Sequence, residues 1–469
     1  MLIIADRLVA LSVTVGLVNP VDRVASSSLS SGSVSGQVPR LVAHTVSVEP
    51  LGEGVDALLA VLPGSGALAW VRRGEGLVGW GEAARVVTSG PQRFEAAQAW
   101  WAQVRELAVV RDDVRRAGTG LVAFGSFAFS YASADESVLI VPKVVVGRRG
   151  SSWWLTTICA EDASGQTSAH VDLLAAHLDE VRHHDPVVSA GSVSFSDGSV
   201  SRAQWMDIVA QAVGRIRGGE LDKIVLARDV VATAERPIDT RFLLTHLVSA
   251  YQGCWTFSVG GLVGATPELL VRAERGLATS RVLAGTIQRT GDDETDTARA
   301  GLLAKSSKDL EEHEYAVISV AEALAPHCTS LNVPESPFVL HLPNVLHLAS
   351  DVTGVIDPHR HETSLSLAAA LHPTAAVCGT PTVRAAHMIA DIELMDRGRY
   401  AGPVGWMGGD GDGEWGIALR SGHLDPTDAR VMRVFAGCGI VAASVPADEL
   451  VETDAKLAPM VSALQGGVA

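Results

Sequence analysis

The sequence is poor in cysteine, in positive charge and in long apolar runs, and each shortage excludes a class of protein. Five cysteines are scattered over 469 residues with no C-x-x-C pair, which argues against a disulfide scaffold or a zinc ribbon and favours a reducing cytoplasm. No apolar run reaches the ~18 residues that a membrane span needs. Lys and Arg total 37 against 53 Asp and Glu, a formal charge of −16. Nucleic acid and anionic membranes are therefore not expected as partners.

The composition is that of a folded protein, with 47% hydrophobic and 19% charged residues. The apolar stretch 8–18 is not expected to be a signal peptide, because Asp6 precedes it and no A-x-A-like cleavage site follows. Residues 26–36 are almost all Ser, Gly and Val, which is typical of a flexible segment. The length allows roughly three domains, but we predict a tail over 1–40 and one fold over 41–469. Within that fold we place a turn-rich boundary at 185–201 between subregions 41–190 and 191–469.

Hydrophobic periodicity predicts a mixture of strands and helices. Strands are expected at 44–50, 67–73, 122–130, 137–147, 153–157, 222–233, 345–353, 403–408, 414–424 and 430–436, and in CWTFSV, LVGATPELLVR and RVLAGTI. Helices are expected at 91–115, 169–183, 239–251, 303–325, 362–371, 382–395 and 446–464. One more helix opens with a capping box at Ser201 and Gln204 and ends at Gly218 and Gly219. Strands that follow one another directly favour large antiparallel sheets covered by helices, an α+β fold.

Two charged residues in apolar surroundings are candidates for acid–base chemistry. Lys223 follows a helix end and enters an apolar strand, where loss of solvent disfavours the charged amine and makes it a better general base. Glu268 lies in GATPELL, where burial favours the protonated carboxyl that a general acid needs. Each has an ordinary alternative, an edge-strand lysine or a turn carboxylate that faces water.

Carboxylates also share a face on two predicted helices. Asp309 and Glu312 are three residues apart, and Glu449, Glu452 and Lys456 repeat this periodicity near the C-terminus. Carboxylates that converge from two helices would suit Mg²⁺, which takes one or two of them together with substrate oxygens. The alternative is two solvated helix faces with ordinary i,i+4 ion pairs.

A third group of residues can bind an anion. Arg420 ends the strand GIALR, and AGCG (436–439) is a small-residue turn whose backbone N–H groups can surround a carboxylate. Tyr400 in RYAGPVGW adds a hydroxyl donor. The alternative is a structural salt bridge beside a tight glycine turn. The segment GGDGDGEWG lacks the spacing of a calcium loop and predicts a hairpin turn.

Taken together and in this order, these segments resemble the chorismate-utilising enzymes, most closely the isochorismate synthases. The resemblance covers about 191–469 and rests on LDKIVLAR, GATPELL, LAGT, SKDLEEHEYAV, LHPTAAVCGTP, DRGRYAGPVGW, GEWGIALRS, FAGCGIV and ETDAKL. It extends more weakly upstream through WVRRGEGLVGWGEA and FGSFAFS. It implies an α+β chorismate-binding fold with two packed antiparallel sheets and outer helices, in a cytoplasmic, monomeric enzyme.

The resemblance also assigns roles to individual residues. It implies that Lys223 activates water and that Glu268 protonates the departing hydroxyl of chorismate. The implied Mg²⁺ ligands are Glu312 and Glu452, with Asp309 and Glu449 behind them. The implied substrate-binding set is Gly285, Thr286, His372, Thr374, Tyr400, Leu419, Arg420, Gly437, Gly439 and Lys456.

A few positions favour water over ammonia as the nucleophile. Lys223 stands where ammonia-using relatives often carry Gln, and Ala284 stands where aminodeoxychorismate-forming relatives carry a nucleophilic lysine. The LHPT segment resembles the isochorismate type, although Ala375 replaces the proline that usually follows it. The sequence therefore predicts an Mg²⁺-dependent isochorismate synthase whose product feeds menaquinone, a siderophore or salicylate. A salicylate synthase on the same scaffold and a non-catalytic metabolite-binding relative remain the alternatives.

Overall fold

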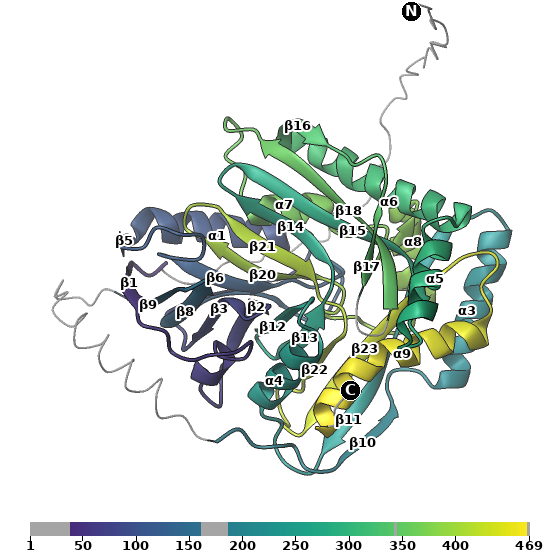
Figure 1. Cartoon of the computed structure of the whole chain (residues 1–469), viewed down its shortest axis with the longest axis horizontal. Helices are drawn as coiled ribbons and strands as arrows, with labels where there is room; N and C mark the ends of the chain where they lie inside the picture. The colour runs from purple at the N-terminus through teal and green to yellow at the C-terminus, as the bar shows by residue number, and fades with distance from the viewer. Residues whose placement is uncertain (1–37, 161–185, 342–344, 467–469) are drawn as a thin grey trace, which may run out of the picture. The chain divides into compact units, whose positions relative to one another are not determined.

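A computed structural model of the chain describes residues 38–160, 186–341 and 345–466, without the side chains of Thr286, Lys308, Asp309 and Glu312. These residues belong to one compact unit, Val34–Ala469, while a second unit, Met1–Ser33, lies outside the described part. Most of the predicted tail and the helix predicted at 169–183 also lie outside it. The strands gather in two sheets and helices lie against them (Figure 1). This arrangement confirms the predicted α+β fold.

The larger sheet has 13 strands. They are β1 (Leu41–Val48), β2 (Leu68–Arg72), β3 (Glu75–Trp80), β5 (Val109–Asp112), β8 (Val144–Arg149), β9 (Ser152–Ala160), β10 (Val193–Asp197), β11 (Lys223–Ala234), β12 (Trp255–Val259), β13 (Leu262–Thr266), β19 (Gly379–Thr380), β22 (Ser421–Leu424) and β23 (Val431–Ile440). Their order is β10-β11-β23-β22-β13-β12-β2-β3-β8-β9-β1-β5, with β19 beside β11. Because β12 pairs with β2, the sheet joins the two predicted subregions.

The smaller sheet has 10 strands. They are β4 (Ala84–Thr88), β6 (Val122–Ser126), β7 (Ser137–Val141), β14 (Leu269–Glu274), β15 (Leu277–Gln288), β16 (Cys328–Asn332), β17 (Phe338–His341), β18 (Val345–Ile356), β20 (Pro403–Gly408) and β21 (Gly413–Ile417). Their order is β16-β18-β15-β14-β21-β20-β6-β7-β4, with β17 beside β18. The turn between β20 and β21 is the predicted hairpin in GGDGDGEWG.

Most helices of the described ranges correspond to predicted ones. They are α1 (Arg93–Leu107), α3 (Arg202–Arg217), α4 (Thr240–Ala250), α5 (Asp293–Leu303), α6 (Ser307–Leu324), α7 (Ser364–Leu371), α8 (Thr382–Ile392) and α9 (Pro446–Gln465), with 3₁₀ turns η1 (Leu59–Val61) and η2 (Ala325–His327). The capping box of Ser201 and Gln204 opens α3 as predicted. In the part of the chain that the structure describes, no helix combines the length and apolar character of a membrane span.

Alternating side chains divide the core into layers, as expected for period-2 strands. Trp70 of β2 and Phe257 of β12 pack against Phe124 of β6 and Trp406 of β20, so one apolar layer lies between the sheets. The opposite face of the larger sheet packs against α4 and α9. The smaller sheet is covered by α1, α6 and α7.

Pairing between distant parts of the chain overrides the local sequence pattern at one predicted helix end and in one predicted turn region. The helix predicted over 91–115 ends at Leu107. The β-branched Val109 and Val110 belong instead to β5, which pairs with β1. This pairing is parallel, whereas antiparallel sheets were expected. The turn-rich segment 185–201 contains β10, which pairs with β11. Strands β4, β16 and β17 and helix α5 were also not expected from the sequence.

Two of the places where the chain passes from one sheet to the other lie next to each other. One crossing connects β13 to β14 through Glu268, and the other connects β21 to β22 through Arg420. The Ile417 N–H donates to the Glu268 carbonyl (3.2 Å) and the Ala265 N–H donates to the Arg420 carbonyl (3.2 Å). These bonds hold the crossings side by side.

Candidate active site

A cavity of about 380 Å³ lies against the two crossings. Its walls come from β11, β23, the crossings themselves, the bulge in β15 and the first half of α9. It collects most of the residues that the sequence singled out: Lys223, Glu268, Gly285, Tyr400, Leu419, Arg420, Gly437, Gly439, Glu449, Glu452 and Lys456.

Lys223 is the first residue of β11, which pairs there with both β19 and β23. Its side chain passes over Gly439: a Cβ on Gly439 would lie 2.9 Å from Lys223 Cε and 3.6 Å from Nζ. Carbon atoms in good contact are about 3.5–4.0 Å apart, so a larger residue at 439 would displace the lysine. The glycine therefore fixes the position of the amine in the cavity.

Glu268 is 7% exposed, and none of the described residues donates a hydrogen bond to its carboxyl group. Burial raises the pKa of this carboxyl to about 7, although Lys223 and Lys456 act in the opposite direction. A carboxyl with this pKa is partly protonated at neutral pH, as a general acid must be. The influence of both lysines shows that the three groups share one electrostatic environment.

Arg420 and Tyr400 supply donors on another wall. Arg420 is 7% exposed and has a φ of +47°, a conformation that costs a non-glycine residue about 1–2 kcal/mol. Its Nη1 is buried and has no hydrogen-bond partner among the described residues, so it is available to an anion. The Tyr400 ring stacks on Phe435 with centroids 5.1 Å apart, and burial raises the pKa of its hydroxyl, which keeps it a donor.

Helix α9 brings carboxylates and a lysine to the cavity. Lys456 Nζ lies 2.7 Å from Glu452 Oε1 and donates to the Gly437 carbonyl at 3.0 Å. Glu449 and Asp448 line the same wall. The helix is anchored from behind, because the buried Arg228 of β11 binds Thr453 and Asp454 on the adjacent turn.

The donor set on α9 fits a hard divalent cation. Carboxylate oxygens are the protein ligands that Mg²⁺ prefers, and Glu449 and Glu452 present them to the cavity. No cluster of three or more potential ligands occurs among the described side chains. Asp309 and Glu312 belong to α6, but their side chains, like that of Thr286, lie outside the described part of the structure.

His347 of β18 is a cavity residue that sequence reasoning missed. Gly285 has a φ of +74° at a register shift between β15 and β18, and its backbone hydrogen-bonds to His347. Burial lowers the pKa of His347 to about 3, so the imidazole is neutral. The only signal in the sequence was a single histidine within the apolar run VLHLA.

A buried ion pair behind the cavity was also missed. Arg397 and Glu393 are 3% and 1% exposed at their side chains and form two contacts of 2.6 and 2.7 Å. Arg397 also donates to the Val225 and Val377 carbonyls, and the Ala227 N–H donates to Glu393. The pair thus supplies hydrogen-bond partners to backbone groups of β11 between the segment that pairs with β19 and the segment that pairs with β10. These bonds help to hold the strand that carries Lys223.

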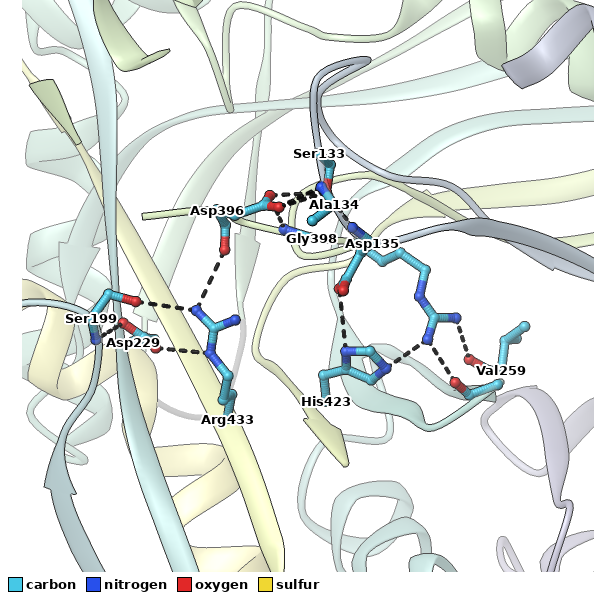
Figure 2. A network of polar contacts seen from close by, with 12 residues as sticks. Ser133, Ala134, Asp135, Ser199, Asp229, Val259, Asp396, Gly398, His423 and Arg433 are labelled. Carbon is cyan, nitrogen blue, oxygen red and sulfur yellow. Dashed lines mark hydrogen bonds and ion pairs between the residues drawn. The ribbon is translucent and has the colours of Figure 1, made fainter. Parts of the chain in front are cut away.

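A further polar network fixes the segment that leads to Tyr400 (Figure 2). Asp396 accepts hydrogen bonds from Ser133, Ala134 and Gly398, and its carbonyl accepts one from Arg433, which also binds Asp229. Arg399 donates to the Val259 and Gly260 carbonyls and to His423. With so many anchors, the backbone before Tyr400 has little freedom.

His372 and Thr374, predicted to bind substrate, are not among the described residues that line the main cavity. The His372 ring hydrogen-bonds to the Phe129 carbonyl at 3.0 Å and packs against Phe94 and Phe129. Burial lowers its pKa to about 3. His372, the C-cap of α7, therefore packs in the core, and its role in substrate binding stays a prediction. Thr374 lines a smaller cavity beside Glu268.

Comparisons with known proteins identify the family of the chain. Residues 68–465 match the chorismate binding enzyme family. The chain is 42% identical over 268 residues to isochorismate synthase DhbC of Bacillus subtilis, covering 55% of this chain and 66% of that protein. It is 30% identical over 409 residues to isochorismate synthase MenF of the same organism, covering 83% and 85%. The solved structure of MenF, the menaquinone-specific isochorismate synthase of Escherichia coli, shares the fold, with a TM-score of 0.74, 24% identity and coverage of 92% and 97%.

Proposed function

The chain belongs to the chorismate-binding enzyme family, and from this premise we propose that it is an isochorismate synthase, an isomerase that converts chorismate to isochorismate. The observation that supports this function is the buried Glu268, with a pKa of about 7, in the same cavity as Lys223. The reaction adds water at C2 of the ring and expels the hydroxyl from C4. It therefore needs one base and one acid at different positions around the ring.

Lys223 and Glu268 are suited to these two roles. Lys223 takes a proton from the attacking water, and Glu268 donates its proton to the departing hydroxyl, which leaves as water. Their origins on different structural elements, the start of β11 and the crossing from β13 to β14, let them reach the substrate from separate walls. Salicylate formation would require pyruvate elimination as a further step.

The dianionic substrate requires donors that offset its two carboxylates. Arg420 offers a buried guanidinium N–H, and Tyr400 offers a hydroxyl. The pairing of β23 with β22 ends at Phe435 in the described sheet. The next residues of β23 have no described strand on that side, and the backbone near Gly437 and Gly439 faces the cavity there. These groups explain how a protein with a charge of −16 accepts an anion.

We also propose that the enzyme depends on Mg²⁺. Glu452 and Glu449, together with Glu312 and Asp309, would hold the ion. A bound Mg²⁺ would offset carboxylate charge on the substrate. Lys456, paired with Glu452, would help to hold these carboxylates in place when substrate binds.

The test is to incubate the protein with chorismate and Mg²⁺, with and without a chelator, and to separate the products. Isochorismate without pyruvate supports the proposal, and loss of turnover with chelator supports the metal. Salicylate with pyruvate would identify a salicylate synthase instead, and tight chorismate binding without turnover would identify a non-catalytic binding protein. In the same assay, a Lys223→Gln variant that retained full water addition would refute the role of the base.

A further inference from the structure

A second, much smaller cavity lies beside Glu268 and has the size of one water molecule. Its volume is about 20 Å³, and about 10–15 Å³ is enough to hold a water. Glu268 and Ala376 line both this cavity and the main one. The remaining walls come from β14, β15, α6 and the residues next to Thr374. Glu268 therefore stands between the substrate cavity and a one-water space.

The small cavity contains polar groups that need a partner. Thr374 Oγ1 is buried and has no hydrogen-bond partner among the described residues. Native proteins usually satisfy such buried groups with protein atoms or ordered water. Ser280 and Ser319 also line the cavity, and a buried water needs two to four polar partners. In so small a space, one water can contact both Thr374 and Glu268.

We propose that this cavity is a water site that bridges the Thr374 hydroxyl and the Glu268 carboxyl and returns a proton to Glu268 after each turnover. The inference rests on the proposed function, in which Glu268 gives its proton to the departing hydroxyl. In the return step, an O–H bond of the water breaks as an O–H bond forms on Glu268. The water takes a proton from the Thr374 hydroxyl, which regains one from solvent by way of Ser319. Lys223 releases the proton of the attacking water to solvent, so the protons balance over a cycle.

Thr374→Val removes the hydroxyl at nearly constant volume, and Thr374→Ser is the matched control that keeps it. We expect kcat of Thr374→Val to fall about tenfold, the change expected from the loss of one hydrogen bond, with the KM for chorismate unchanged. The solvent deuterium isotope effect on kcat should increase, because the proton return becomes slow. Thr374→Ser should stay close to wild type in both measurements, and thermal unfolding of both variants confirms that they fold.

Two outcomes would overturn the proposal: an unchanged kcat in Thr374→Val, or a raised KM at constant kcat, which would make Thr374 a substrate-binding residue. A high-resolution crystal structure of the wild-type protein tests the water site without relying on activity. Water density between Thr374 and Glu268 is expected there, and its absence would refute the site. Failure of the wild-type protein to form isochorismate would instead refute the proposed function.

Discussion

Replacing Gly439 by alanine should reduce catalysis without unfolding the protein. The new Cβ would lie 2.9 Å from Lys223 Cε, whereas good carbon contacts are about 3.5–4.0 Å. The end of the lysine side chain must therefore move by about 0.6–1 Å. A displacement of this size at a reacting group can cost about a hundredfold in rate, or ~2.7 kcal/mol of barrier.

The measurement is kcat and KM for chorismate in wild type and Gly439→Ala, together with thermal unfolding. Because the contact is with a flexible side chain rather than with backbone, the unfolding temperature should change little. Gly214→Ala in α3 is the control, since nothing lies within 4 Å of its Cβ position; it should leave kcat unchanged and stabilise the helix by about 0.5–1 kcal/mol. A wild-type kcat in Gly439→Ala would refute the claim that this glycine positions the amine.

Three further outcomes follow from the site. Glu268 acts in its protonated form, so kcat/KM should fall as pH rises through about 7. Glu268→Gln should lose about 10²–10⁴-fold of the rate together with this pH dependence; a profile of kcat/KM against pH that keeps the dependence in Glu268→Gln would contradict the assignment. Glu393→Gln leaves Arg397 as a buried, uncompensated charge and should cost about 3–5 kcal/mol in denaturant unfolding; an unchanged unfolding free energy would show that the charge of Arg397 is balanced elsewhere. Arg420→Lys should lower kcat/KM for chorismate about 10–100-fold through loss of a charge-assisted hydrogen bond; an unchanged value would show that the substrate carboxylate lies elsewhere.

Local signals in the sequence were sufficient for much of the fold. The capping box at Ser201 and Gln204 and the glycine after α3 were predicted correctly, because caps depend on a few adjacent residues. Strands β5 and β10 were not predicted, because their partners β1 and β11 lie far away in the sequence. The four residues of β5, VVRD, are too few to show a periodic pattern, and the alternation in β10, VSFSD, lies among Ser, Gly and Asp residues that are typical of turns.

The candidate site was predictable mainly through the resemblance to known enzymes. Taken singly, Lys223 and Glu268 had ordinary alternatives, and only their presence in one cavity favours catalysis. Glu393 and Arg397 are four residues apart, a spacing that is common in surface ion pairs, yet both side chains are buried and bond to the edge of β11. For His372 the resemblance predicted a substrate contact, whereas the structure shows a side chain that bonds to the Phe129 carbonyl and packs on its ring, so this role stays a prediction.

The two crossings between the sheets couple core packing to the reaction. Lys223 belongs to the larger sheet, whereas Glu268 lies where the chain leaves it for the smaller one. Leu269 and Ala418, next to the two crossings, are part of the apolar layer that also contains Trp70 and Phe257. A core substitution in that layer that preserves stability can therefore still shift Glu268 relative to Lys223 and change turnover.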